Sequence, residues 1–318
     1  MRVDVHAHLW VEEYMDVAER EGPDYLKPNV KFLRRLGGSE SEKDMGARFE
    51  HMDETGIDLQ VISPSGLPLY SEDEKKAVEL AHWSNDFFAG WVERHPDRFR
   101  SYAVLPLPNI EASIAEIERS FDTLGMRGVI MLTSILDVSP ADPKFDPVWA
   151  ELDRRGAVVF FHPAGVAAGS QRLMKEGLAW NIGAPIEDTA TATQLVHASI
   201  PVRYPNVKII IAHVGGAMPM LLARLDDQPD PAAQFATSEP PSAIAKRLFY
   251  DTISHGHPPA LRCAVESFGV DQIVFGTDYP ANTGDRARRQ VDYVTEAVPA
   301  ETANQILDLN AARLFGFS

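Results

Sequence analysis

Eight short apolar runs, each followed by a segment with helical periodicity, set the strongest limit on how this chain can fold. This alternation is typical of a parallel sheet whose strands are joined by helices. Because the runs are apolar almost throughout, we expect both faces of each strand to be buried. The predicted strands are 2–9, 58–64, 100–107, 127–133, 157–163, 207–214, 247–253 and 272–280. Eight such units predict an α/β fold of the closed (β/α)8 barrel type.

The 318 residues suit one large barrel domain, because no repeat or linker divides them. We therefore predict a single domain over 1–318. Two connections that follow strands are long, at about 10–57 and 164–206. In barrels such connections fold over the end where the strands finish, which is also where active sites lie. Both segments are predicted to form a lid.

Three of the predicted helices carry clear end signals. Ser41 precedes an acidic first turn, and Gly56 follows the last apolar residue of the same segment. Asn109 is the expected cap of a second helix that should end at Gly125. A third segment should end at Gly156. Glycines placed directly before strands predict short turns at the opposite end of the barrel from the lid.

Charge and cysteine content exclude several classes of protein. A net charge of −16 argues against nucleic-acid binding, which needs a clustered basic surface. No apolar run reaches the roughly 18 residues of a membrane helix. The first strand should begin at Arg2, which leaves no room for a secretory signal, so a cytoplasmic location is expected. The single cysteine, Cys263, excludes a cysteine-rich metal site and is predicted to be a buried thiol in a helix.

Histidines and an aspartate stand where the predicted strands end. In the opening stretch "DVHAH", Asp4, His6 and His8 share one face of a strand, because side chains alternate along it. Further along the chain, other strands end at His162, His213 and Asp278. Any one of these residues has an ordinary structural explanation. Together they predict a metal site, because strand ends converge in a barrel and imidazoles with a carboxylate suit a borderline divalent ion, zinc first and manganese second.

These motifs also resemble a known family. "DVHAH", "HP" at 162–163, "AHVGGAMP" and "GTDYP" are similar to the amidohydrolase superfamily, and together they most resemble its branch of aminocarboxymuconate-semialdehyde and hydroxybenzoate decarboxylases. The resemblance extends through "ARFEHMDETGID", "LAWNIGAPIEDTATATQLV" and "FYDTISH". It implies that His213 lies beside the metal as an acid/base residue or as a residue that polarises the substrate. The implied metal ligands are His6, His8, His162 and Asp278.

The resemblance also implies residues that bind substrate. Arg48 corresponds to an arginine that holds a substrate carboxylate, and Trp180 to a pocket tryptophan. Arg224 corresponds to an arginine that reaches the active site of a neighbouring subunit, which implies a homodimer or a higher homo-oligomer. His255 corresponds to a histidine after the seventh strand. Two-metal members of the superfamily carry a lysine or glutamate at the end of strand four, and "RGVIMLTS" offers neither, so one metal ion is expected.

These features predict a metal-dependent, non-oxidative decarboxylase of a small unsaturated or aromatic acid, such as a hydroxybenzoate or a muconate-type acid. Two mechanisms stay open: a water activated by the metal adds to the substrate with help from His213, or the substrate binds the metal and Asp278 delivers a proton to the ring. The alternatives are a hydrolase, either a lactonase or an amidohydrolase, and a hydratase, since the same centre can perform those reactions. A metal-binding protein without catalytic activity is the alternative from another class.

Overall fold

The computed structural model describes the whole chain except residues 22–25, 68–69, 228–238 and 318. Eight strands form one sheet in chain order, and all neighbouring strands are parallel. They are β1 (Val3–His8), β2 (Leu59–Ser63), β3 (Phe99–Val104), β4 (Gly128–Leu132), β5 (Val158–His162), β6 (Lys208–Ile211), β7 (Phe249–Asp251) and β8 (Ile273–Val274). The eight predicted runs therefore correspond to the eight strands of a (β/α)8 barrel.

The segment that follows β8 closes the ring against β1. The predicted last strand ran from 272 to 280, whereas regular strand structure ends at Val274. Beyond it the backbone still pairs with β1: the Asp278 N–H donates to the His6 carbonyl at 2.7 Å, and the His8 N–H donates to the Tyr279 carbonyl at 2.7 Å. Asp278 has a φ of +57°, so the chain leaves regular strand geometry at this residue.

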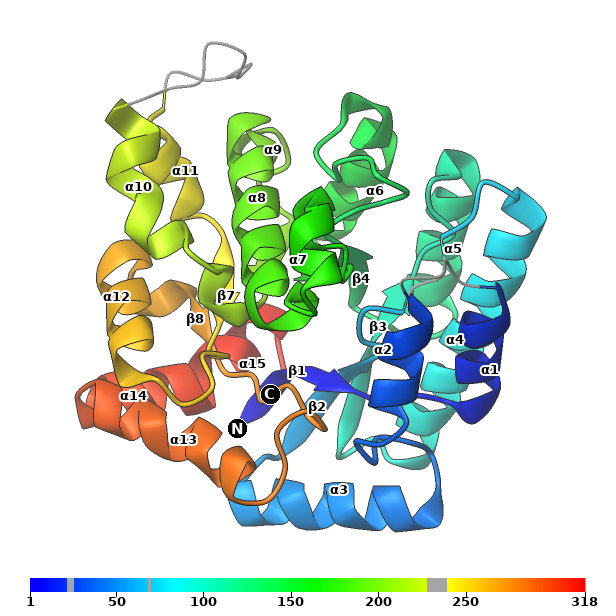
Figure 1. Cartoon of the computed structure of the whole chain (residues 1–318), viewed down its shortest axis with the longest axis horizontal. Helices are drawn as coiled ribbons and strands as arrows, with labels where there is room; N and C mark the ends of the chain where they lie inside the picture. The colour runs from blue at the N-terminus through cyan, green and yellow to red at the C-terminus, as the bar shows by residue number, and fades with distance from the viewer. Residues whose placement is uncertain (22–25, 68–69, 228–238, 318) are drawn as a thin grey trace.

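The helices surround this barrel (Figure 1). The longer ones are α1 (Glu12–Glu21), α2 (Leu26–Leu33), α3 (Glu42–Thr55), α4 (Glu74–Arg94), α5 (Ile110–Asp122), α6 (Asp146–Arg155), α8 (Ala184–His197), α10 (Met218–Asp227), α12 (Pro258–Phe268) and α13 (Asp285–Ala297). The short ones are α7 (Gln171–Lys175), α9 (Ile200–Arg203), α11 (Pro241–Ala245), α14 (Ala300–Asn304) and α15 (Asn310–Phe315). Among the helices described here, none combines the length and apolar character needed to span a bilayer.

Strand β5 shows how the two layers of the core arise from alternation. Phe160 points into the barrel, where its ring lies 5.2 Å from that of Tyr102 and 4.9 Å from that of His6. Phe161 points outward and meets Trp149 of α6 at 6.2 Å. His162 is one further step along the inward face. The periodicity of the strand therefore places this histidine at the mouth of the barrel, above a packed interior.

The predicted helix ends are confirmed in two cases and corrected in one. The Ser41 hydroxyl accepts the Asp44 N–H at 3.3 Å, and both Gly56 and Gly156 adopt the left-handed conformation after α3 and α6. Asn109 occupies the cap position of α5 without a side-chain capping bond, because its amide donates to the carbonyls of Ser71 and Pro106 instead. That helix ends at Asp122, three positions before the predicted Gly125.

The two long connections contribute unequally to the mouth of the barrel. In the first, Phe32, Leu33 and Leu36 line a cavity there, whereas α3 packs beside α13 on the outside (Figure 1). In the second, Trp180, Asn181, Ala184 and Pro185 line the same cavity, just before and at the start of α8. The lid remains a prediction. Within the described residues of the two long connections, these short segments at the cavity are positioned to form part of it.

Candidate active site

Four side chains meet at the mouth of the barrel. His6 and His8 come from β1, His162 ends β5, and Asp278 follows β8. One nitrogen or oxygen of each residue lies within 4.8 Å of the corresponding atom of the other three. The Nε2 atoms of His6 and His8 are 3.1 Å apart, and Asp278 Oδ1 lies 3.3 Å and 3.1 Å from them. The structure therefore brings together the four residues that the resemblance implied as metal ligands.

The surrounding protein turns these imidazoles toward one another. His6 Nδ1 donates to the Asp251 carboxylate at 2.6 Å, and His162 Nδ1 donates to the Pro163 carbonyl at 3.0 Å. Because these oxygens accept the Nδ1 protons, Nε2 is the atom that each ring presents to the cluster. His8 Nδ1 is likewise engaged, at 3.0 Å from the Ser63 hydroxyl. Partners of this kind fix ring orientation and leave Nε2 for a cation.

Electrostatics favour a positive charge at this point. Burial disfavours the charged form of His6, but its bonds and charge interactions with Asp251 and Asp278 outweigh burial and raise its pKa to about 10. Burial lowers the pKa of His8 to about 4 and that of His162 well below the usual range. The cluster thus holds two neutral imidazoles, a carboxylate and one site that attracts a proton. Nitrogen and oxygen donors in this arrangement fit one divalent cation.

Asp4 holds the strands beneath this cluster. It is fully buried inside the barrel, and burial raises its pKa to about 6 despite its hydrogen bonds. Its carboxylate accepts the Thr277 hydroxyl at 2.6 Å, the Gln60 amide at 2.9 Å and the His6 N–H at 3.1 Å. It therefore ties β1 to the segment that carries Asp278.

His213 lies beside the four-residue cluster, and its ring centre is 6.1 Å from that of His162. It follows β6 with a φ of +51°, and its Nδ1 lies 2.9 Å from Asp188 Oδ2 on α8. Burial opposes protonation of His213, but the Asp188 carboxylate outweighs it and raises the pKa of the imidazole. His213 is therefore a candidate proton donor that faces the same space as the metal group.

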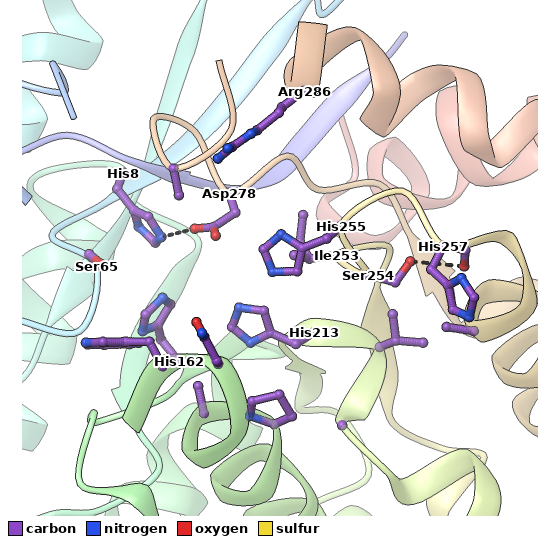
Figure 2. Close-up of a pocket in the computed structure, with 18 of the residues that line it drawn as sticks. His8, Ser65, His162, His213, Ile253, Ser254, His255, His257, Asp278 and Arg286 are labelled. Carbon is purple, nitrogen blue, oxygen red and sulfur yellow. Dashed lines mark hydrogen bonds and ion pairs between the residues drawn. The ribbon is translucent and has the colours of Figure 1, made fainter. Parts of the chain in front are cut away.

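A cavity of about 670 Å³ opens above these residues, as Figure 2 shows. His8, His162, His213 and Asp278 all line it. Its other walls are mainly apolar and include two indoles; their larger apolar residues include Trp10, Phe32, Leu33, Leu36, Trp180, Met220 and Ile253. A space of this size and lining suits a small flat molecule.

Two of the four predicted substrate-binding residues line this cavity. Trp180 lies with its ring centre 6.4 Å from that of His162. His255 is exposed, and Figure 2 draws its ring between Asp278 and His213. Arg224 is exposed on α10 and is absent from the lining. Cys263 is half-buried in α12 and lines the cavity, which corrects the prediction of a buried thiol.

Arg48 occupies a different place from the one expected. It is buried under the barrel mouth, with its guanidinium 4.4 Å from the Tyr279 ring centre, and it is absent from the cavity lining. One terminal nitrogen donates to Gln60 Oε1 at 2.9 Å, and the other donates to the His8 carbonyl. Because the protein itself engages this fork, the geometry gives Arg48 the role of holding the strand that carries His8, and does not favour direct binding of a substrate carboxylate.

Sequence reasoning missed three residues near the site. Asp251 ends β7 in "FYDTISH", where a buried acid at a strand end was a usable signal. Asp188 stands inside a helix, and its pairing with His213 depends on tertiary packing alone. Arg286 lies in the first turn of α13 and lines the cavity, although its sequence context "GDRARRQ" reads as an ordinary exposed helix start.

Comparison with known proteins identifies the family. The amidohydrolase family model matches residues 3–317. This chain belongs to the amidohydrolase family. Among amidohydrolase relatives, 2-amino-3-carboxymuconate-6-semialdehyde decarboxylase of Dictyostelium discoideum is 26% identical, over 99% of this chain and 92% of the relative. Gamma-resorcylate decarboxylase of Rhizobium radiobacter is 28% identical, over 84% of this chain and 86% of the relative.

A solved structure agrees in fold. Dihydroxybenzoic acid decarboxylase from Polaromonas, determined with manganese and the inhibitor 2-nitroresorcinol, superposes with a TM-score of 0.82 at 24% identity. The match covers 99% of this chain and 96% of that one. This amidohydrolase therefore shares its fold with that structure over nearly the whole length of both chains.

Proposed function

We propose that this amidohydrolase is a metal-dependent, non-oxidative decarboxylase of small aromatic or unsaturated carboxylic acids. The observation that carries the proposal is the convergence of three imidazole Nε2 atoms and Asp278 at the floor of a largely apolar cavity. Relatives that match most of the chain are named decarboxylases of an aminocarboxymuconate semialdehyde and of gamma-resorcylate. Both substrates are small unsaturated acids, which suits the size and lining of the cavity.

We propose that His6, His8, His162 and Asp278 hold one divalent ion. The nitrogen-rich donor set favours Zn²⁺, while the manganese in the Polaromonas structure makes Mn²⁺ the second choice. When bound, the ion supplies Lewis-acid polarisation of the substrate oxygens. Asp278 Oδ1 faces the imidazoles, and the buried histidines exclude water from that side.

The proton that replaces the carboxylate comes, in this proposal, from His213. The bond between the ring carbon and the carboxylate breaks, carbon dioxide leaves, and the electron pair left on carbon takes a proton from the imidazolium. The Asp188 carboxylate raises the pKa of His213 and so favours its protonated form, whereas interaction with His6 and His8 outweighs burial and keeps the pKa of Asp278 well below its usual range. Solvent then returns a proton to His213, so atoms and charge balance over the cycle.

Replacement of Asp188 by asparagine should change the pH dependence of turnover. Because the pKa of His213 is raised, its imidazole is fully protonated at pH values below the ordinary histidine pKa. It loses the proton as the pH rises through the raised pKa of His213. Without the carboxylate that raises it, the pKa falls, so activity should be lost at a lower pH. We expect the basic limb of the kcat profile to shift by about one unit, a change of about 1.4 kcal/mol.

A profile measured for the wild type, Asp188→Asn and the exposed control Asp292→Asn tests this assignment. The control lies on α13 and should match the wild type. An unchanged basic limb in Asp188→Asn would show that His213 is not the titrating donor.

We also propose a homodimer, because Ile182, Ile186 and Met220 expose 48%, 41% and 72% of their surface near α8 and α10, the helix that carries Arg224. Apolar side chains gathered on neighbouring helices are typical of an interface. Sedimentation of the metal-loaded protein as a monomer at micromolar concentration would refute the homodimer.

A cytoplasmic location is proposed from the single cysteine, Cys263, which leaves no intrachain disulfide. Recovery of the protein from the periplasmic or secreted fraction would refute this location.

The proposed reaction is tested by incubating the metal-loaded protein with hydroxybenzoates and muconate-type acids and analysing the products. Release of carbon dioxide with the decarboxylated ring compound supports it. Release of a ring-opened or hydrated acid without carbon dioxide would favour the hydrolase or hydratase alternative, because the same donor set serves those reactions.

A further inference from the structure

One guanidinium reaches the cavity wall. Arg286 lies in the first turn of α13, is exposed, and lines the cavity. Figure 2 shows its side chain extending over the side of the cavity that holds His8 and Asp278. Within the described part of the chain, its guanidinium makes no hydrogen bond or ion pair. Its charge is therefore available to a bound molecule.

The other arginines of the same helix face protein partners. Arg288 lies 3.6 Å from a Glu54 oxygen, and Arg289 donates to Glu296 at 2.7 Å. Arg286 thus differs from its neighbours in having its free end directed to the cavity and not to an acidic side chain. An exposed arginine without an ion pair is common and costs little free energy. The position of Arg286 at the cavity, and not its lack of a partner alone, therefore suggests a role in binding.

The charges around the cavity support an anionic ligand. Among the described residues that line it, Asp278 is the one carboxylate and Arg286 is the one side chain with a permanent positive charge. A divalent ion held beside Asp278 would leave this space with a net positive charge, since Arg286 offsets the carboxylate. A dianionic acid neutralises more of that charge than a monoanionic acid does.

We propose that Arg286 is a specificity-determining residue that binds a second anionic substituent of the substrate. This inference rests on the proposed function, in which the carboxylate to be lost lies at the metal group. The apolar walls, with Trp10, Phe32 and Met220, accept the ring. The substrate class is therefore an aromatic acid that carries another carboxylate or an equivalent anionic group. Guanidinium is suited to this role because its fork matches two carboxylate oxygens.

Binding to the Mn²⁺-loaded protein, measured by calorimetry near neutral pH, tests the inference without any turnover. The probes are benzoate, isophthalate and terephthalate, which differ in the number and spacing of carboxylates. We expect the wild type to bind at least one dicarboxylate about 10-fold or more tightly than benzoate, as a charge-assisted hydrogen-bonded pair provides. Arg286→Met should abolish this preference, because removing the guanidinium should weaken dicarboxylate binding more than benzoate binding. Arg286→Lys should keep part of it, because the charge remains without the fork.

Arg288→Met is the matched control, since it removes the same charge from the same helix at a position absent from the cavity lining. It should preserve the preference. The inference is overturned if neither dicarboxylate binds more tightly than benzoate, if Arg286→Met keeps the preference, or if Arg288→Met loses it equally. Failure of the proposed function is a separate result: a protein that shows the preference and releases no carbon dioxide from any hydroxybenzoate or muconate-type acid retains Arg286 as an anion-binding residue and loses the decarboxylase assignment.

Discussion

Asp278→Asn is expected to remove the bound metal ion and to lower turnover by at least about 10³-fold. The substitution keeps the shape of the side chain but deletes the charge that faces His6 Nε2 and His8 Nε2 at 3.3 Å and 3.1 Å. A neutral amide is a poor ligand for a divalent ion beside imidazoles. Loss of Lewis-acid stabilisation worth several kcal/mol corresponds to three or more powers of ten in rate.

Metal content by elemental analysis and decarboxylation rate, measured on the same preparation, test this expectation. Asp285→Asn is the matched control, because it makes the same chemical change seven positions further along, on a fully exposed side chain at the start of α13. The control should retain both metal and activity. An Asp278→Asn protein that binds one equivalent of metal as tightly as the wild type would contradict the assignment of Asp278 as a ligand.

Gly216→Ala is expected to destabilise the protein by about 3 to 5 kcal/mol, from backbone strain and overpacking together. Gly216 has a φ of +61° and a ψ of −120°, a conformation that essentially only glycine adopts. An added Cβ would lie 2.0 Å from the Pro185 carbonyl oxygen and 2.4 Å from the Thr189 hydroxyl. Both groups belong to α8, so the clash would push apart the helix that carries Asp188 and the turn that carries His213.

Gly125→Ala is the control that measures the cost of a positive φ for alanine without the clash that an added Cβ would make at Gly216. Gly125 also has a positive φ, of +71°, but a Cβ there would meet no neighbouring atom within 4 Å. It should cost only about 1 to 2 kcal/mol, the strain of the left-handed conformation. Urea unfolding of both variants and the wild type measures the difference. Equal stability of the two variants would show that the close approach of Gly216 to α8 is not a constraint on the fold.

The barrel was predictable because a strand that is buried on both faces consists mostly of apolar residues. Eight such apolar runs follow one another along the chain. The metal group was predictable for a related reason: barrel topology brings strand ends together, so His6, His162 and Asp278 had to become neighbours despite their separation in sequence. Alternation along β1 also placed Asp4 beneath the cluster. In each case a local pattern and one topological rule were enough.

The residues that escaped prediction depend on side-chain direction and not on strand order. Arg48 was expected in the pocket, yet its helix turns the guanidinium beneath His8. Asp188 reaches His213 only because α8 packs beside the turn after β6. Arg286 lines the cavity together with Asp278 and Ala281, although it lies in the first turn of a helix. Sequence periodicity fixes which face of an element is buried, but it does not state where a long side chain at a helix end will point.

The measurement that tests the central claim most directly is carbon dioxide release from a 2-hydroxybenzoate by the chelator-stripped protein before and after addition of one equivalent of Mn²⁺ or Zn²⁺. The four-residue group predicts no release from the stripped protein and recovery of turnover that saturates at one ion per chain. The same titration with Asp278→Asn should show no recovery. Full carbon dioxide release from the stripped protein, or restored metal content without release from any substrate in the panel, would contradict a metal-dependent decarboxylase.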